Sequence, residues 1–303
     1  MSLLPSQILV LERGWLSSNN ILFLEGEGAS LVDSGYGSHA EQTLALLRHA
    51  LDGRGLSRLL NTHSHSDHIG GNAAVKRAFG CRIAIPVGLD AMVADWDEHA
   101  LMLTSSAQSA ERFAHDALLA PGDELELGGL SWRAVAAPGH DMHALMFHCP
   151  EKRILISGDA LWRDGFGVIF SELLGVPDGL ASARATLEDI ARLPVDVVIP
   201  GHGAAFAEVD DALEKAFARL AAFEADGARL ARHALKVLLS FCLMEKGRMA
   251  RDELPLFLAQ TELCRRIDER YLGLGPEALA EWLVLDLARA GVLVCRGNDI
   301  VTA

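Results

Sequence analysis

The stretch NTHSHSDHIGG, from Asn61 to Gly71, constrains this chain more than any other part of its sequence. It follows the apolar run SRLL, which has the length and composition of a strand, and it places three histidines and one aspartate within six positions. His63 and His65 are two residues apart, so at the end of a strand both rings can point the same way. Asp67 and His68 follow where a helix is expected to begin. A polar loop is the alternative interpretation, but this crowding of ligand groups predicts a metal site.

Three further residues end other apolar runs and complete the pattern. They are His140 in APGHD, Asp159 in ISGDA and His202 in IPGHG, and each lies beside glycine in the kind of loop on which active sites are built. We expect these strand ends to converge on one edge of the fold. Five imidazoles and two carboxylates are too many for one tetrahedral ion and suit two zinc ions, with iron or manganese as alternatives.

Strand-like and helical patterns alternate through the first two hundred residues, in two series separated by a polar insertion. The strand-like runs cover residues 21–26, 29–35, 57–63, 81–86, 123–129, 130–140, 143–149, 152–160 and 195–203. Two strand-rich halves with helices predict an α+β fold in which two sheets stack face to face and helices cover both outer sides, a four-layer αββα sandwich.

From about Asp210 the patterns become helical, and the closing segment VLVCRGNDIV has the form of a hairpin. Helices followed by a terminal hairpin are typical of a winged-helix module. We therefore expect a catalytic domain over residues 1–225 and a small, helical, winged-helix-like domain over residues 226–303.

The formal net charge of −14 opposes broad binding to nucleic acid, which draws its affinity from clustered Lys and Arg. The longest strongly apolar run, Val237 to Met244, is too short to cross a bilayer, and no basic residue precedes the apolar residues of Met1 to Val10. These features predict a soluble, cytoplasmic protein without a signal peptide or a membrane partner. The oligomeric state is left open.

Seven residues resemble, in order and in strand context, the dinuclear ligands of the metallo-β-lactamase superfamily: His63, His65, Asp67, His68, His140, Asp159 and His202. The resemblance extends from about residue 7 to residue 225 and includes the LVDSG segment at residues 31–35. It implies the αββα fold, and it implies that His63, His65 and His140 hold one ion. The second ion would be held by Asp67, His68 and His202, with Asp159 as the bridge.

The implied activity is hydrolysis, in which a hydroxide between the two ions attacks an ester, thioester, lactone or phosphodiester bond of a small molecule. Asp67 and Asp159 would orient the ions and accept a proton. His65 replaces the glutamate of the flavodiiron relatives, and Asp159 is an aspartate that true β-lactamases usually lack. The stretch around His63 is similar to the glyoxalase II form, whereas the helical tail looks more like that of the lactamase-like endoribonucleases.

Several other residues are candidates for supporting roles. Asp33 either accepts a hydrogen bond from a ligand histidine, which would fix its tautomer, or is a turn or helix-cap aspartate. Trp162, Phe166 and Phe170 follow Asp159 and are expected to line an apolar substrate channel, with core packing as the alternative. His143 is a candidate substrate contact or simply the start of a strand. Residues 94–119 are expected to form a helical lid over the metals.

Two other classes of protein remain alternatives. One is a mononuclear-iron oxidoreductase that resembles the persulfide dioxygenases, for which bound iron and production of sulfite would be the evidence. The other is a nucleic-acid-binding or processing protein that acts through its C-terminal domain. That domain carries five arginines over residues 248–270, but acidic residues are interleaved with them and indicate a solvated helix face.

Overall fold

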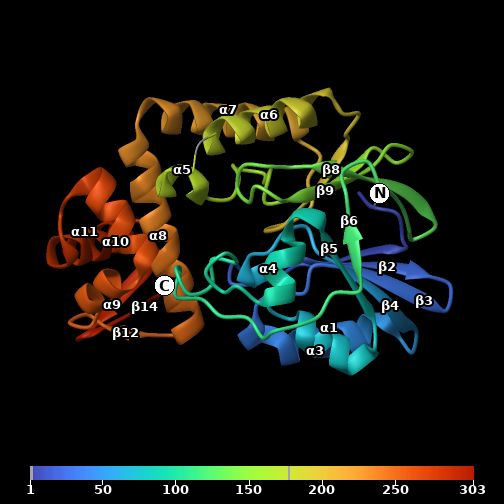
Figure 1. The fold of residues 1–303 in the computed structure, drawn as a ribbon, viewed down its shortest axis with the longest axis horizontal. Coiled ribbons are helices and arrows are strands. Elements are labelled where there is room, and N and C mark those ends of the chain that lie inside the picture. The colour runs from blue at the N-terminus through green and yellow to red at the C-terminus, as the bar shows by residue number, and fades with distance from the viewer. Residues whose placement is uncertain (1–2, 177) are drawn as a thin grey trace.

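Two β-sheets stack face to face in the middle of the molecule, and helices cover the outer side of each sheet (Figure 1). This computed structural model describes residues 3–176 and 178–303. The architecture is the αββα sandwich expected from the two series of strands, and the predicted α+β fold class is confirmed.

The first sheet has six strands in chain order: β1 (Ile8–Leu11), β2 (Asn20–Glu25), β3 (Gly28–Val32), β4 (Gly55–Leu60), β5 (Arg82–Pro86) and β6 (Ala117–Leu119). The strands β1 to β3 form an antiparallel meander, whereas β3 to β6 run parallel, with Leu31 opposite Leu59 and Leu59 opposite Ile83. The parallel strands therefore bring their carboxyl ends to one edge of the sheet.

The second sheet has five strands in the order β11 (Val197–Pro200), β10 (Ile154–Gly158), β9 (Leu145–Cys149), β8 (Leu130–Ala136) and β7 (Glu124–Leu127). Among these described strands, only β10 and β11 pair in parallel. Both strands are buried along their whole length, as expected for parallel strands that are covered on both faces.

The core between the sheets is built from the inward-facing residues of both. Along β8 the buried residues Leu130, Trp132 and Ala134 alternate with exposed ones, because successive side chains of a strand point to opposite faces. The indole of Trp132 meets the ring of Phe23 of β2 edge-on, with the ring centroids 5.3 Å apart. Full burial of a large apolar side chain contributes roughly 1.5–3 kcal/mol, so this core holds the two sheets together.

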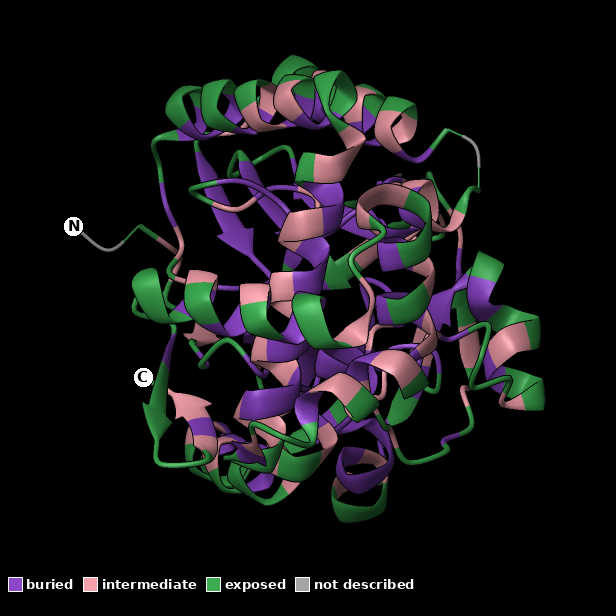
Figure 2. Cartoon of the chain, turned by 90° about the vertical axis from the view of Figure 1, so that its left-hand side faces the viewer, coloured by how far each residue is buried: buried purple, intermediate pink, exposed green. Residues whose placement is uncertain are grey.

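Helices cover the outer faces of the sheets, with buried residues toward the strands and exposed residues toward solvent (Figure 2). The first sheet carries η1 (Gly37–His39), α1 (Ala40–Leu51), α2 (Ser66–Ile69), α3 (Asn72–Phe79), η2 (Val87–Leu89) and α4 (Asp90–Asp95), and the second carries α5 (Phe170–Leu174), α6 (Gly179–Arg192) and α7 (Val209–Ala225). In α1, Leu44, Leu47 and Leu51 recur every three or four residues and form the buried face. The helix ends where Asp52 adopts a left-handed conformation.

The C-terminal part of the chain is helical with one small sheet: α8 (Gly227–Lys246), β12 (Met249–Ala250), α9 (Leu254–Gln260), α10 (Glu262–Ile267), η3 (Asp268–Leu272), α11 (Pro276–Arg289), β13 (Leu293–Arg296) and β14 (Asp299–Thr302). The predicted domain boundary falls between α7 and α8, where the Asp226 side chain accepts hydrogen bonds from two amides of α8.

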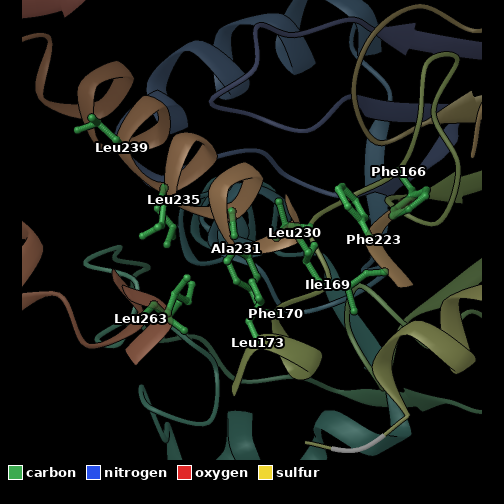
Figure 3. Packing of buried hydrophobic residues seen from close by; sticks show 14 of the residues in the cluster. Phe166, Ile169, Phe170, Leu173, Phe223, Leu230, Ala231, Leu235, Leu239 and Leu263 are labelled. Carbon is green, nitrogen blue, oxygen red and sulfur yellow. The ribbon is translucent and has the colours of Figure 1, made fainter. Parts of the chain in front are cut away.

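A single apolar cluster crosses this boundary, and α8 packs Leu230, Ala231 and Leu235 near Phe170 (Figure 3). None of the helices within the described residues is long and apolar enough to span a membrane.

Candidate metal centre

The seven predicted ligands lie together at the carboxyl ends of strands from both sheets. His63 and His65 follow β4, Asp67 and His68 belong to α2, and the remaining three follow the second-sheet strands β8, β10 and β11. Two glycines permit this close approach. A Cβ atom on Gly71 would collide with the carbonyl of Ser34, and one on Gly201 would collide with a carboxylate oxygen of Asp159. The motif therefore needs glycine where α2 meets the first sheet and where β11 meets the bridge candidate.

The side chains form two groups, and each brings its ligand atoms within 4.8 Å of one another. The first group is His63, His65 and His140, and the second is Asp67, His68, Asp159 and His202. In the first group, Nδ1 of His65 lies 2.7 Å from Nε2 of His140. In the second, Nε2 of His202 lies 3.0 Å from Oδ2 of Asp67. The grouping follows the division that the resemblance implied, except that Asp159, expected as the bridge, falls with the second group.

Asp159 lies between the two groups. Its Oδ2 atom is 3.3 Å from Nε2 of His140 in the first group, and its Oδ1 atom is 3.4 Å from Nε2 of His68 in the second. Oδ2 is also 3.9 Å from Nε2 of His202 in the second group, so the carboxylate is close to ligand atoms of both groups, as a bridging ligand would be. The indole N–H of Trp162 donates a hydrogen bond of 3.1 Å to Oδ1 and fixes the orientation of the carboxylate.

Hydrogen bonds behind the ligands determine which ring nitrogens face inward. Nδ1 of His68 donates to Oδ2 of Asp33 at 2.7 Å, and Nδ1 of His140 donates to the carbonyl of Val168 at 2.6 Å. Each bond leaves the Nε2 lone pair free to bind an ion. Asp33 also accepts from the amide and the hydroxyl of Thr62, so of its two expected roles the structure favours support of a ligand ring.

Whether these residues fit metal ions can be judged from buried ring nitrogens that have no hydrogen-bond partner in the protein. Nε2 of His63 and Nε2 of His68 are enclosed, and neither has a hydrogen-bond partner within the described part of the chain. A buried polar atom left unsatisfied costs about 1–3 kcal/mol, so such atoms usually have a ligand. Imidazole nitrogens beside carboxylates are the donors that zinc, iron and manganese accept. The residues fit a pair of such ions.

Electrostatics prepare the same atoms for binding. Burial lowers the pKa of His63 well below its ordinary value and the pKa of His65 to about 4, so both rings are neutral at pH 7. For Asp67 and Asp159, burial raises the pKa, but the neighbouring histidines, His68 above all, outweigh it and lower the pKa overall. The two carboxylates and the rings of His63 and His65 are therefore in the protonation states that bind metals. Burial lowers the pKa of His68, but the carboxylates of Asp33, Asp159 and Asp67 outweigh burial and raise it, so an ion that binds His68 displaces a proton.

The site opens into a cavity of about 650 Å³ between the sandwich and the C-terminal helices. Trp162 lines this cavity as expected, and so does Phe170. Trp15, which the sequence analysis did not single out, stacks on the His202 ring at a centroid distance of 5.4 Å. Trp15 is 55 % exposed and stands in a loop without a recognisable motif, so the sequence carried no signal for it.

Two residues expected in the substrate channel lie elsewhere, which corrects those assignments. Phe166 belongs to the apolar core, where it meets Phe223 edge-on, because the turn at Trp162 to Gly165 directs it inward. His143 is exposed and packs against Gly88, away from the cavity. The expected lid over residues 94–119 is mostly turns and irregular chain after α4, although Leu101, Met102 and Leu103 do line the cavity.

Comparisons with known proteins agree with this geometry. Two curated hydroxyacylglutathione hydrolases, from Cereibacter sphaeroides and Methylococcus capsulatus, are 31% identical over 158 residues and 34% identical over 153 residues. Each alignment covers 50% of this chain. It covers 51% of the Cereibacter protein and 50% of the Methylococcus protein, so the chain spans about half the length of the curated relatives it matches.

Solved structures share the fold. A metallo-beta-lactamase family protein from Thermus thermophilus aligns over 100% of both chains with a TM-score of 0.59 and 22% identity. A class B3 di-zinc metallo-beta-lactamase from an Alaskan soil metagenome covers 71% of this chain and 90% of its own, with a TM-score of 0.56 and 20% identity. The model of the metallo-beta-lactamase superfamily matches residues 13–202. This chain belongs to the metallo-beta-lactamase superfamily.

Proposed function

We propose that this protein is a hydrolase that holds two zinc ions and cleaves a thioester bond of a small molecule. The observation that carries the proposal is the position of Asp159 between two complete groups of ligand atoms. The names of the curated relatives, which are hydrolases of a glutathione thioester, support a thioester among the acyl and phosphoryl bonds that such a site can cleave.

When bound, a pair of divalent ions lowers the pKa of a water molecule and polarises the oxygen of the bond to be cleaved. The protein residues hold this arrangement in place. Asp33 and the Val168 carbonyl lock the rings of His68 and His140, and Trp162 locks the Asp159 carboxylate. These bonds hold the ligands before substrate arrives, so little reorganisation is needed during the reaction.

Asp67 is the residue that we assign to proton transfer. Its carboxylate lines the cavity, and the neighbouring His68 and His202 keep it ionised despite its burial. An oxygen of Asp67 can therefore accept the proton released by the attacking water and return it to the leaving thiolate. Trp15 and Trp162 flank His202 and shield this part of the site from bulk water.

The second ligand group favours two ions over a single iron. A mononuclear-iron oxygenase needs only one set of protein ligands, whereas four side chains form the second group here. The C-terminal arginines also give little support to nucleic-acid binding, because Arg248, Arg265 and Arg266 each form an ion pair with a nearby acidic residue.

One preparation tests the proposal directly. The purified protein should contain two zinc ions per chain and should hydrolyse a hydroxyacylglutathione thioester faster than a lactone, a phosphodiester or a β-lactam. Failure to turn over any of the four substrates with two ions bound would overturn it. Bound iron with production of sulfite from a persulfide would replace it with the oxygenase alternative.

A matched pair of variants tests the bridge. Asp159→Asn should lower zinc occupancy and remove most of the activity, because one carboxylate serves both ligand groups. Asp189→Asn changes an exposed aspartate of α6, which pairs with Arg192 and does not line the cavity, and should behave like the unmodified protein. Equal zinc content and turnover in the two variants would contradict the bridging role.

A further inference from the structure

The cavity above the metal centre has an apolar wall that the metal chemistry does not require. One face of α8 provides Val237, Phe241 and Met244, and the loop after α4 provides Leu101 and Met102. The three residues of α8 are only partly buried, so their apolar surface is available to a ligand. The volume of about 650 Å³ lies within the range of small-molecule sites, roughly 300–1,000 Å³. An acyl chain or another apolar body fits such a wall.

Two arginines that line the cavity, Arg163 and Arg219, form no ion pair with any residue that the structure describes, but Arg163 is exposed to solvent. Arg219 of α7 lines the cavity and is partly buried, yet its guanidinium forms no hydrogen bond and no ion pair with any residue that the structure describes. Asp164, the acidic residue that influences it, forms its ion pair with Lys215 instead. Guanidinium groups that are partly removed from water usually have an anionic partner, because burial of an unpaired charge is costly.

The surroundings of Arg219 set it apart from the metal centre. Its guanidinium lies against Gly165, in the turn that follows Trp162, and the charges that act on it are those of Asp164 and Arg229. Lys236 of α8 also lines the cavity, but it is paired with Asp286. His233 lies close to both cations and also lines the cavity. Arg219 is therefore an unpaired positive charge at a second position along the cavity, in a chain whose net charge is −14.

We propose that the substrate carries an apolar body, which lies along α8, and an anionic group, a carboxylate or a phosphate, which binds Arg219. This inference rests on the proposed function, because the metal centre defines where the bond to be cleaved lies. Arg219 acts as a specificity residue: its planar guanidinium can donate two parallel hydrogen bonds to either anion. Substrates without the anionic group would still reach the metal centre but would bind more weakly.

Binding can be measured without turnover, on the zinc-loaded full-length protein. The probes are α,ω-dicarboxylates of six to twelve carbons with the matched monocarboxylates, and phosphorylated pantetheine with pantetheine. The signal is the change in tryptophan fluorescence on binding, because Trp15 and Trp162 line the cavity. Each carboxylate pair supplies the same carboxylate to the metal centre, so any gain in affinity reports the second anion. We expect at least one dicarboxylate to bind roughly tenfold more tightly than its monocarboxylate. Equal affinities throughout the carboxylate series, together with equal affinities for pantetheine and its phosphate, would overturn the inference.

The variants Arg219→Gln and Arg229→Gln assign the effect to one residue. Arg229 is exposed and does not line the cavity, so its variant should keep the preference for the anionic ligand. Arg219→Gln should lose the preference while it binds the neutral member of each pair as before, and Arg219→Lys should restore part of it. A preference that survives in Arg219→Gln would overturn the assignment. If Arg219→Gln does not fold, the comparison of ligands on the unmodified protein decides the question.

The two sources of the anion are distinguished by the ligand. Preference for the dicarboxylates indicates a substrate with a terminal carboxylate, and preference for phosphorylated pantetheine indicates a phosphate-bearing thiol carrier. The inference also fails separately from the proposed function. If the protein prefers anionic ligands but hydrolyses no ester or thioester, the Arg219 site is supported and the proposed hydrolase activity is wrong. If it hydrolyses such bonds without that preference, the activity is supported and the Arg219 site is wrong.

Discussion

Asp33 combines an unusual backbone conformation with a key contact. Its φ of 57° is in the left-handed region, which costs free energy for any residue with a side chain. The conformation is held by hydrogen bonds from Thr62 and His68 to the carboxylate. The strained turn thereby aims the carboxylate at a ligand ring, and strain that serves a site in this way is common at functional positions.

The variant Asp33→Asn should weaken zinc binding at the second ligand group roughly 10–100-fold. The amide keeps the shape of the side chain but removes the charge that holds Nδ1 of His68 in its donor form. Competition with a chromogenic chelator measures the affinity. Asp52→Asn is the matched control, because Asp52 also has a positive φ but lies at the exposed end of α1. Unchanged affinity for both ions in Asp33→Asn would contradict the supporting role.

The ligand candidates could be predicted from sequence because four of them crowd into six positions after an apolar run and the other three each end an apolar run beside glycine. Strand ends of this kind converge by geometry. Arg219 could not be predicted, because its position in α7 resembles any surface arginine of an amphipathic helix. Its role depends on how α7 and α8 pack, which residue spacing does not encode. For Phe166 the sequence-based prediction was wrong. Because Phe166 is close to Asp159 in sequence, we expected it to line the substrate channel, but after the turn from Trp162 to Gly165 it packs in the core against Phe223.

At the scale of elements, α11 packs against α8 and α9 of the C-terminal part through one face. Leu283 is fully buried in the apolar cluster that also contains residues of the sandwich, whereas Leu285 on the same helix is 52 % exposed. Leu283→Ala should lower the free energy of unfolding by about 2–5 kcal/mol, because it leaves a cavity. Leu285→Ala should change it by no more than about 0.5 kcal/mol. Denaturant unfolding of both variants checks this, and similar losses would show that the face is packed differently.

The helix α8 carries a histidine whose protonation opposes folding. Burial, together with the nearby charges of Arg219 and Lys236, lowers the pKa of His233 to about 4, so the folded protein holds the ring neutral. The unfolded chain titrates near pH 6.5 and binds a proton first as the pH falls. The contribution of His233 to stability is therefore complete above about pH 6.5 and is lost as the pH falls toward 4.

Replacement of this histidine should reveal the effect. In His233→Gln, the dependence of unfolding free energy on pH should become shallower between about pH 4 and 6.5, by up to about one proton. Denaturant unfolding at several pH values measures the slope. The two slopes should coincide above pH 7, where the ring is neutral in both states. A variant with the slope of the unmodified protein over the whole range would rule out a neutral, buried His233.

At the scale of the whole molecule, the candidate metal centre takes its ligands from the sides of both sheets. Asp67 and His68 come from the first sheet side, and Asp159 and His202 come from the second. Removal of both ions should therefore lower the melting temperature by roughly 5 °C or more, and zinc should restore it, because an ion that binds only the folded state stabilises that state. Scanning calorimetry with and without a chelator measures the shift. A melting temperature that is independent of zinc would show that the ions do not link the sheets.

The sequence predicted the overall fold of the protein in more detail than it predicted the substrate. Alternating strand and helix patterns are local, so two sheets with outer helices followed from the sequence, and so did the change to helices near residue 210. The cavity formed between the sandwich and α8 could not be predicted, because it depends on the angle at Asp226 and on which apolar residues remain uncovered there. The winged-helix character of the tail and its independence as a domain stay predictions.

The two sides of the cavity come from separate stretches of the chain, with the metal ligands before residue 203 and the α8 wall after residue 226. Mutations in one stretch can therefore alter which compounds enter, while the other stretch keeps the capacity to cleave them. Descendants of such a protein can acquire new substrates through changes in α7 and α8 that leave every metal-ligand candidate in place.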